Sequence, residues 1–138
     1  MNDYTRYSHL DTHIFVWLNQ NDIRLTDRYR RVIEKEREQG LGVFTISLIE
    51  IARLVNAKKI ILPLPIQEWF NIALSQEGII LISITPKIAV EAQDLPSDFH
   101  KDPADRIIVA TARIFDIPVV TVDKKILSYS SVKTIEPK

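Results

Sequence analysis

Strand-length apolar runs alternate with longer amphipathic stretches along the chain. Runs of four to six residues rich in Val, Ile and Leu are typical of strands. We predict strands over 7–11, 42–47, 79–84 and 118–122, with a further edge strand over 131–135. The β-branched run at 79–84 has no polar alternation, so we expect it to be a buried strand.

Capping residues and prolines delimit the helices between these runs. Thr26 precedes a charged helix that ends before Gly40, and Pro86 and Pro103 each open a helix in its first turn. The predicted helices span 12–18, 26–39, 48–57, 65–78, 85–95 and a stretch from 103 onwards. On the third of these we expect Ile49, Ala52 and Leu54 to face inwards.

Strands that alternate with helices predict an α/β fold. Right-handed crossovers place helices on both faces of a mainly parallel sheet, which gives three α/β/α layers. The 138 residues fit a single domain over 1–138.

Composition narrows the chemistry. There is no cysteine, so thiolate metal sites and cysteine nucleophiles are excluded. Eighteen basic residues balance eighteen acidic ones, so contact with nucleic acid requires local clusters of Lys and Arg. No signal peptide or membrane-spanning run is evident, and we expect a soluble, cytoplasmic protein with no membrane contact.

Four acidic residues fall where predicted strands meet predicted helices. Asp11 ends the first strand and Asp123 follows the run 118–122, while Glu50 and Asp105 lie near helix starts. Ligands of open parallel sheets bind at the carboxyl ends of the strands. Carboxylates gathered there suit one or two hard divalent cations, which activate water for phosphodiester hydrolysis.

Helix capping is the competing explanation for each acid. Ser47 and Glu50 have the spacing of a capping box, and Asp102 and Asp105 have a related one. Asp11 is an acceptable N-cap, as is Asp123. Capping accounts for the acids one at a time and does not require them to converge.

Four segments resemble, in order, the motifs of PIN domains. They are LDTHIFVWL from Leu10, SLIEIARL from Ser47, HKDPADRIIVATA from His100 and VVTVD from Val119. The resemblance covers about residues 8–135. The DPADR motif at Asp102–Arg106 and the stretch from Leu62 to Pro65 resemble the corresponding segments of VapC-like toxins of toxin–antitoxin pairs.

This resemblance implies a PIN-like fold and an endoribonuclease dependent on Mg²⁺ or Mn²⁺. It further implies a homodimer and a VapB-like antitoxin as partner. The family's acids map to Asp11, Glu50, Asp105 and Asp123 as catalytic and metal-binding residues, with Thr121 as polar companion. Asp105 is preferred to Asp102, which is better placed as a helix N-cap.

Basic residues near the acids are candidates for contact with RNA. Lys101, Lys124 and Lys125 are adjacent in sequence to acidic motifs, and Lys58 and Lys59 follow the helix of Glu50. Arg106 either neutralises a carboxylate, meets phosphate or forms a structural ion pair. The charged helix over 26–39 is expected to be mainly a solvated face.

Other functions remain open at this stage. A PIN nuclease of RNA processing, without a toxin role, would carry the same acids. A haloacid-dehalogenase-like phosphohydrolase requires a second Asp two residues after the first, and His13 stands there. A receiver domain requires an acidic pair before the end of the first strand, which the chain lacks, and a late Lys at a strand end, where Asp123 stands. His9, Asp11 and His13 have the spacing of a transition-metal site, but the end of the strand should turn His13 away.

Overall fold

A parallel β-sheet forms the centre of the protein. The computed structural model describes residues 8–137, and within them every strand of the sheet runs parallel to its neighbours. The spatial order is β3-β2-β1-β4-β5. The strands are β1 (Ser8–Leu10), β2 (Leu41–Phe44), β3 (Ile79–Ile82), β4 (Val119–Val120) and β5 (Thr134–Ile135).

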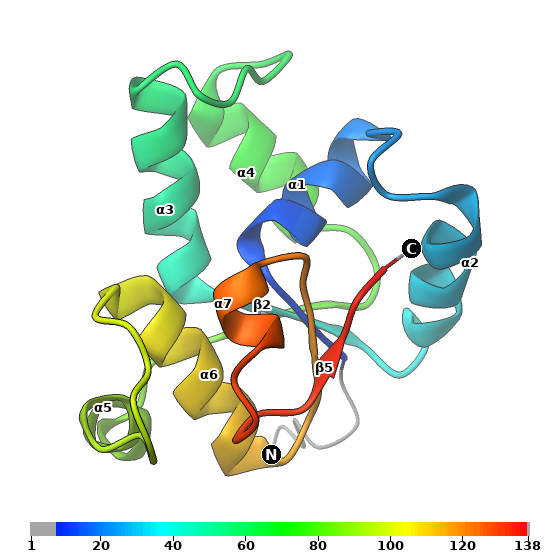
Figure 1. Ribbon diagram of the computed structural model, residues 1–138. Coiled ribbons are helices and arrows are strands. Elements are labelled where there is room, and N and C mark those ends of the chain that lie inside the picture. The colour runs from blue at the N-terminus through cyan, green and yellow to red at the C-terminus, as the bar shows by residue number, and fades with distance from the viewer. Residues whose placement is uncertain (1–7, 138) are drawn as a thin grey trace.

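Helices cover both faces of this sheet (Figure 1). They are α1 (Thr12–Gln20), α2 (Asp27–Glu36), α3 (Thr45–Asn56), α4 (Ile66–Leu74), α5 (Pro86–Gln93), α6 (Pro103–Phe115) and α7 (Lys124–Leu127). No helix within residues 8–137 is long and apolar enough to cross a bilayer. The predicted three-layer α/β fold is therefore confirmed.

Two hydrophobic cores fill the spaces on either side of the sheet. Leu10 and Val120 face the core that α1, α2 and α4 cover. Phe44 and Val119 face the second core, which includes residues of α5, α6 and α7. Consecutive strand residues thus point to opposite faces, as the two-residue period of a strand requires.

The strand over 79–84 is shorter and less buried than predicted. β3 ends at Ile82 and Leu81 is 39% exposed. Its position in the strand order explains this, because β3 is an outer strand and pairs only with β2. A continuous apolar run does not distinguish a central strand from an edge strand.

The helix over 48–57 begins three residues earlier than predicted, at Thr45. The chain turns from β2 directly into α3, and the buried positions become Ser47, Ile51 and Leu54. Ile49 is 66% exposed and Ala52 is also exposed, so the prediction that they face inwards was wrong. The start of a helix decides which residues share its inner face.

Gly42 makes room for two side chains of neighbouring strands. It pairs with His9 of β1 and Ile80 of β3. A Cβ atom at position 42 would lie 2.5 Å from Ile82 Cδ1 and 3.0 Å from His9 Cδ2. The missing side chain lets the buried imidazole pack edge-on against Phe44, with a ring separation of 5.4 Å.

We predict that Gly42→Ala lowers the free energy of unfolding by about 1–3 kcal/mol, because the added methyl overpacks the core. Urea denaturation of the two proteins measures the difference. Ile82→Val removes the Cδ1 atom that is contacted, so the double variant should lose less stability than the two single losses added together. Strict additivity of the two losses would contradict this explanation.

Candidate active site

Asp11 lies at the point where the order of the strands reverses. It follows β1, whose two neighbours are β2 and β4. The chain leaves β1 and β2 towards one edge of the sheet and returns to β4 on the other side of β1. Such switch points leave a crevice at the carboxyl ends of the strands, which is where α/β proteins bind their ligands.

Two hydrogen bonds fix the Asp11 carboxylate, which is only 6% exposed. Thr121 Oγ1 donates to Oδ2 at 2.5 Å, and the backbone N–H of Thr12 donates to Oδ1 at 2.8 Å. The second bond caps the N-terminus of α1. Asp11 is therefore both a helix cap and a carboxylate held at the switch point.

Burial raises the pKa of Asp11 above its usual value. The hydrogen bonds from Thr121 and Thr12 act in the opposite direction, because they favour the charged form. The negative charges of Glu50 and Asp123 raise the pKa further. These charges act on Asp11 from elements far apart in the sequence.

Glu50 lies in the second turn of α3, since the helix starts at Thr45. The expectation of a capping box from Ser47 was wrong: the N-cap residue is Phe44, and it makes no side-chain cap. Ser47 is fully buried, and its Oγ accepts a 2.8 Å hydrogen bond from Thr12 Oγ1. This bond joins the helix that carries Glu50 to the residue after Asp11.

Asp123 follows β4 and caps α7. Its Oδ1 accepts from the N–H groups of Lys125 and Ile126 at 2.8 and 3.3 Å. Its own N–H donates to Thr121 Oγ1 at 2.9 Å. One threonine hydroxyl thus contacts both Asp11 and Asp123, at the position predicted for the polar companion.

Asp105 lies in the first turn of α6 but does not cap it. The N-cap is Asp102, whose Oδ1 accepts from the Asp105 N–H at 3.2 Å, as predicted. The Asp105 carboxylate is instead beside His100, with Nε2 2.9 Å from Oδ2. That contact is short but lacks the alignment of a hydrogen bond.

The pKa of Asp105 is raised to about 7, first by burial and then by the charges of Asp123, Asp102, Asp11 and Glu50, in decreasing order. Five carboxyl groups from four regions of the chain therefore share one electrostatic field. Capping alone does not require such mutual repulsion, whereas a binding site for a cation does.

Arg106 serves the structure around the site. Its guanidinium donates to the carbonyl oxygens of Ala92, Phe99 and His100 at 2.8, 2.9 and 3.2 Å, and to that of Gln93 at 3.4 Å. It therefore holds the segment that carries His100 against α5, and a phosphate would have to compete with four carbonyls.

The three lysines predicted to contact substrate are all exposed. Lys101 lies beside Asp102, and Lys124 and Lys125 form the first turn of α7 after Asp123. Lys125 also lines a cavity of about 270 Å³ together with His100.

The histidines near Asp11 do not join it. His9 is fully buried on the sheet face towards Phe44 and Phe115, and neither ring nitrogen has a hydrogen-bond partner. Burial lowers the pKa of His9 to about 4, so its ring is neutral. His13 is exposed on α1, with its ring 6.2 Å from that of Trp17. A His–Asp–His metal site is therefore not formed.

The donor chemistry fits a hard divalent cation. All the clustered groups are carboxyl oxygens, the ligands that Mg²⁺ and Mn²⁺ prefer. Their repulsion would be relieved by positive charge. Within residues 8–137 no three His, Asp or Glu side chains are arranged to hold an ion as they stand. A cavity of about 220 Å³ lined by Glu50 and Asp102 borders the cluster.

Sequence reasoning missed one contributor to the site. Thr12 links Asp11 to Ser47 through its backbone and its hydroxyl. Its only signal was a hydroxyl residue directly after the acid that ends a strand. His100 begins the third motif, and its contact with Asp105 depends on how Arg106 holds the loop before α6.

Known proteins resemble this chain over most of its length. Residues 9–131 match the model of the PIN domain family. The chain is 36% identical over 120 residues to ribonuclease VapC22 of Mycobacterium tuberculosis, a match that covers 87% of this chain and 89% of the relative.

Two solved structures share the fold. A toxin–antitoxin complex from Klebsiella pneumoniae has a TM-score of 0.63 at 22% identity. The match covers 95% of this chain and 98% of the chain in that complex. VapBC2 from Rickettsia felis, bound to a DNA fragment from the promoter, has a TM-score of 0.70 at 18% identity. The match covers 94% of this chain and 97% of the chain in that structure.

We predict that Asp105→Asn is more stable than the wild type in EDTA, and increasingly so as pH rises. With a pKa of about 7 in the folded state against 3.8 ordinarily, folded Asp105 holds an extra proton between these values. Its contribution to stability therefore falls from about pH 4 to pH 7 and stays low above that. We expect a gain of about 1–2 kcal/mol at pH 8, because solvent screens part of the repulsion.

Urea denaturation at pH 5 and pH 8 measures this gain. The pH dependence from His9 is common to both proteins and cancels in the difference. Asp116→Asn is the control, since Asp116 is exposed and outside the acidic cluster. If Asp105→Asn is less stable than the wild type at both pH values, the Asp105 carboxylate supports the fold and the prediction is wrong.

Proposed function

Because the chain belongs to the PIN-domain family, we propose that it is a metal-dependent endoribonuclease of the VapC type that hydrolyses RNA phosphodiester bonds. The observation that carries the proposal is the group of carboxyl groups around the switch point, where burial and then the charges of four other acids raise the pKa of Asp105. The 36% identity to a ribonuclease over most of the chain supports the reaction class.

We assign Asp11, Glu50, Asp105 and Asp123 as the residues that would hold Mg²⁺ or Mn²⁺, with Asp102 at the exposed rim. When bound, such a cation lowers the pKa of a water molecule and stabilises charge on the phosphoryl oxygens. Four carboxylates carry the charge of about two divalent ions. Each acid comes from a different element, so the folded chain is needed to present them together.

The chain's own groups orient this site. Thr121 fixes Asp11 and Asp123 relative to each other through one hydroxyl. The Thr12–Ser47 bond fixes the helix of Glu50 to the same point. Lys101, Lys124 and Lys125 are exposed next to the acids and supply positive charge for the phosphates on either side of the cut.

The proposal includes partners. The two solved structures of like fold are toxin–antitoxin assemblies, and we propose a VapB-like antitoxin, a homodimer and action in the cytoplasm for this chain. An RNA-processing nuclease without a toxin role would use the same acids. Growth arrest on induction, relieved by co-expression of a cognate antitoxin, separates the toxin from that alternative.

We predict that RNA cleavage requires Mg²⁺ or Mn²⁺ and that Asp11→Asn lowers it at least about 100-fold, equal to ~3 kcal/mol. The amide oxygen can still accept from the Thr12 N–H and the amide NH₂ group can donate to the Thr121 hydroxyl, but an amide binds a hard cation poorly. A time course with labelled single-stranded RNA, with each metal and with EDTA, measures this.

Asp116→Asn is the matched control and should cleave like the wild type, since it makes the same change at an exposed residue outside the acidic cluster. Thermal melts verify that both variants are folded. If the wild type cleaves RNA equally well in EDTA and the Asp11→Asn variant is also active, the metal mechanism is refuted.

A further inference from the structure

A cavity of about 300 Å³ lies between α1 and the segment that follows α3. One wall is a stripe of α1 that includes His13, Trp17 and Gln20, and the other includes Lys58 and Lys59. Gln20 Nε2 donates to the Ile61 carbonyl at 3.4 Å, which ties the two walls together. The proposed metal ligands do not line this cavity.

The α1 wall leads away from the acidic site. His13 is in the first turn of α1, which Asp11 caps, and Gln20 is the last residue of the helix. At a rise of 1.5 Å per residue, the stripe from His13 to Gln20 extends about 10 Å. A linear ligand held at Asp11 therefore has a neighbouring channel along α1.

Positive charge is concentrated at this cavity although the whole chain is neutral. Its charged lining residues are Arg24, Lys58, Lys59 and the single acid Asp22. Asp22 accepts from Arg24 at 2.7 and 3.0 Å, and the guanidinium lies 4.8 Å from the centre of the Trp17 ring. Within residues 8–137, neither lysine has a carboxylate partner.

Lys58 occupies a backbone conformation that favours glycine. Its φ is 60°, in the left-handed region, just after the C-cap residue of α3. Glycine is the usual residue at this position of a helix end, because a Cβ atom is strained there. Glycine would be less strained at this position, so the helix end itself does not require a lysine side chain.

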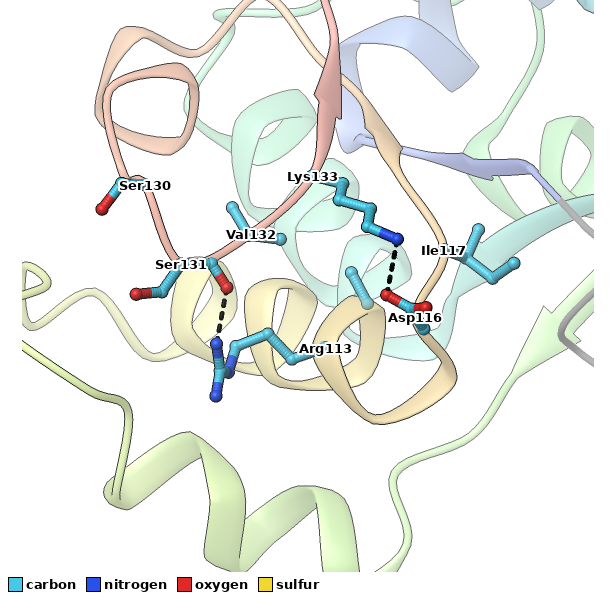
Figure 2. A pocket seen from close by; sticks show the side chains of 8 residues that line it. Arg113, Asp116, Ile117, Ser130, Ser131, Val132 and Lys133 are labelled. Atoms are coloured by element: carbon cyan, nitrogen blue, oxygen red, sulfur yellow. Dashed lines mark hydrogen bonds and ion pairs between the residues drawn. The ribbon is translucent and has the colours of Figure 1, made fainter.

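Another charged pocket of the molecule differs because its positively charged side chains are paired. Figure 2 shows it at the end of α6, where the chain approaches β4, and its volume is also about 300 Å³. Its cations are engaged: Arg113 donates to the Ser131 carbonyl and pairs with Glu91, and Lys133 pairs with Asp116 at 2.8 Å. The lysines beside α1 have no such partners.

We propose that the cavity beside α1 binds the sugar–phosphate backbone of single-stranded RNA next to the bond that is cut, with Lys58 and Lys59 as its phosphate contacts. This inference rests on the proposed ribonuclease function and deepens it. Free ammonium groups on long side chains suit a flexible polyanion, and Arg24 over Trp17 adds charge to the same wall.

The first test measures binding of a labelled single-stranded RNA by fluorescence anisotropy in EDTA, across a series of salt concentrations. Lys58→Gly combined with Lys59→Ala should weaken binding about tenfold at low salt. It should also reduce the slope of log K against log salt by about 1.4, since each lost phosphate contact removes about 0.7. Lys87→Ala removes one positive charge at an exposed lysine of α5, away from the cavity, and as the control it should change neither.

The second test separates the use of Lys58 from a structural role. Lys58→Gly alone should raise Tm by a few degrees while it weakens RNA binding, because glycine relieves the strained φ. Asp116→Gly is the matched control: Asp116 has a φ of 54° at the end of α6, so its Tm should rise without a change in RNA binding. A lower Tm for Lys58→Gly would mean that the lysine serves the helix end, and would overturn the inference.

The remaining outcomes distinguish the two proposals. If the wild type binds RNA and the double variant keeps the full salt slope, the cavity is not the RNA track and only this inference fails. If the double variant keeps RNA binding but loses a labelled oligoglutamate peptide, the cavity belongs to an acidic protein partner, which also overturns it. If the wild type neither binds nor cleaves RNA with Mg²⁺ or Mn²⁺, the proposed function fails as well.

Discussion

The nearly buried carboxylate of Asp11 is the constraint on which the rest of the site depends. Burial opposes its charge and raises its pKa, and the hydrogen bonds from Thr121 and Thr12 act against that rise. Both donors are available only because β1 lies between β2 and β4 and turns at once into α1. The strand order and the first helix start are thus requirements for placing one carboxylate at the switch point.

In the proposed function, helix capping and metal binding are compatible, and two of the acids take part in both. Asp11 and Asp123 cap helices while they face the shared field, and Asp102 caps α6 at its rim. Asp105 and Glu50 cap nothing. Burial and the repulsion from the other acids raise the pKa of Asp105 to about 7, and both are costs to the fold that a bound cation would offset. Natural sites often retain such locally unfavourable groups because function requires them.

A chain with no net charge can still present opposite charges to different parts of one substrate. The acids gather at the carboxyl ends of the strands, and Lys58 and Lys59 lie along the channel that starts at the first turn of α1. In the proposed function the acids hold cations at the scissile phosphate, while the lysines bind neighbouring phosphates. Within residues 8–137 neither lysine is ion-paired with one of these acids.

The sequence alone determined the features that depend on local rules: the alternation of strands and helices, the caps at Thr26 and Asp102, and the position of acids at strand ends. These follow from hydrophobic period and capping chemistry, which act over a few residues. Only the tertiary structure decided that Ile49 is exposed, that Arg106 binds carbonyls and that Lys58 borders a cavity. Each of these depends on which distant segments pack against the residue, and no short-range pattern carries that information.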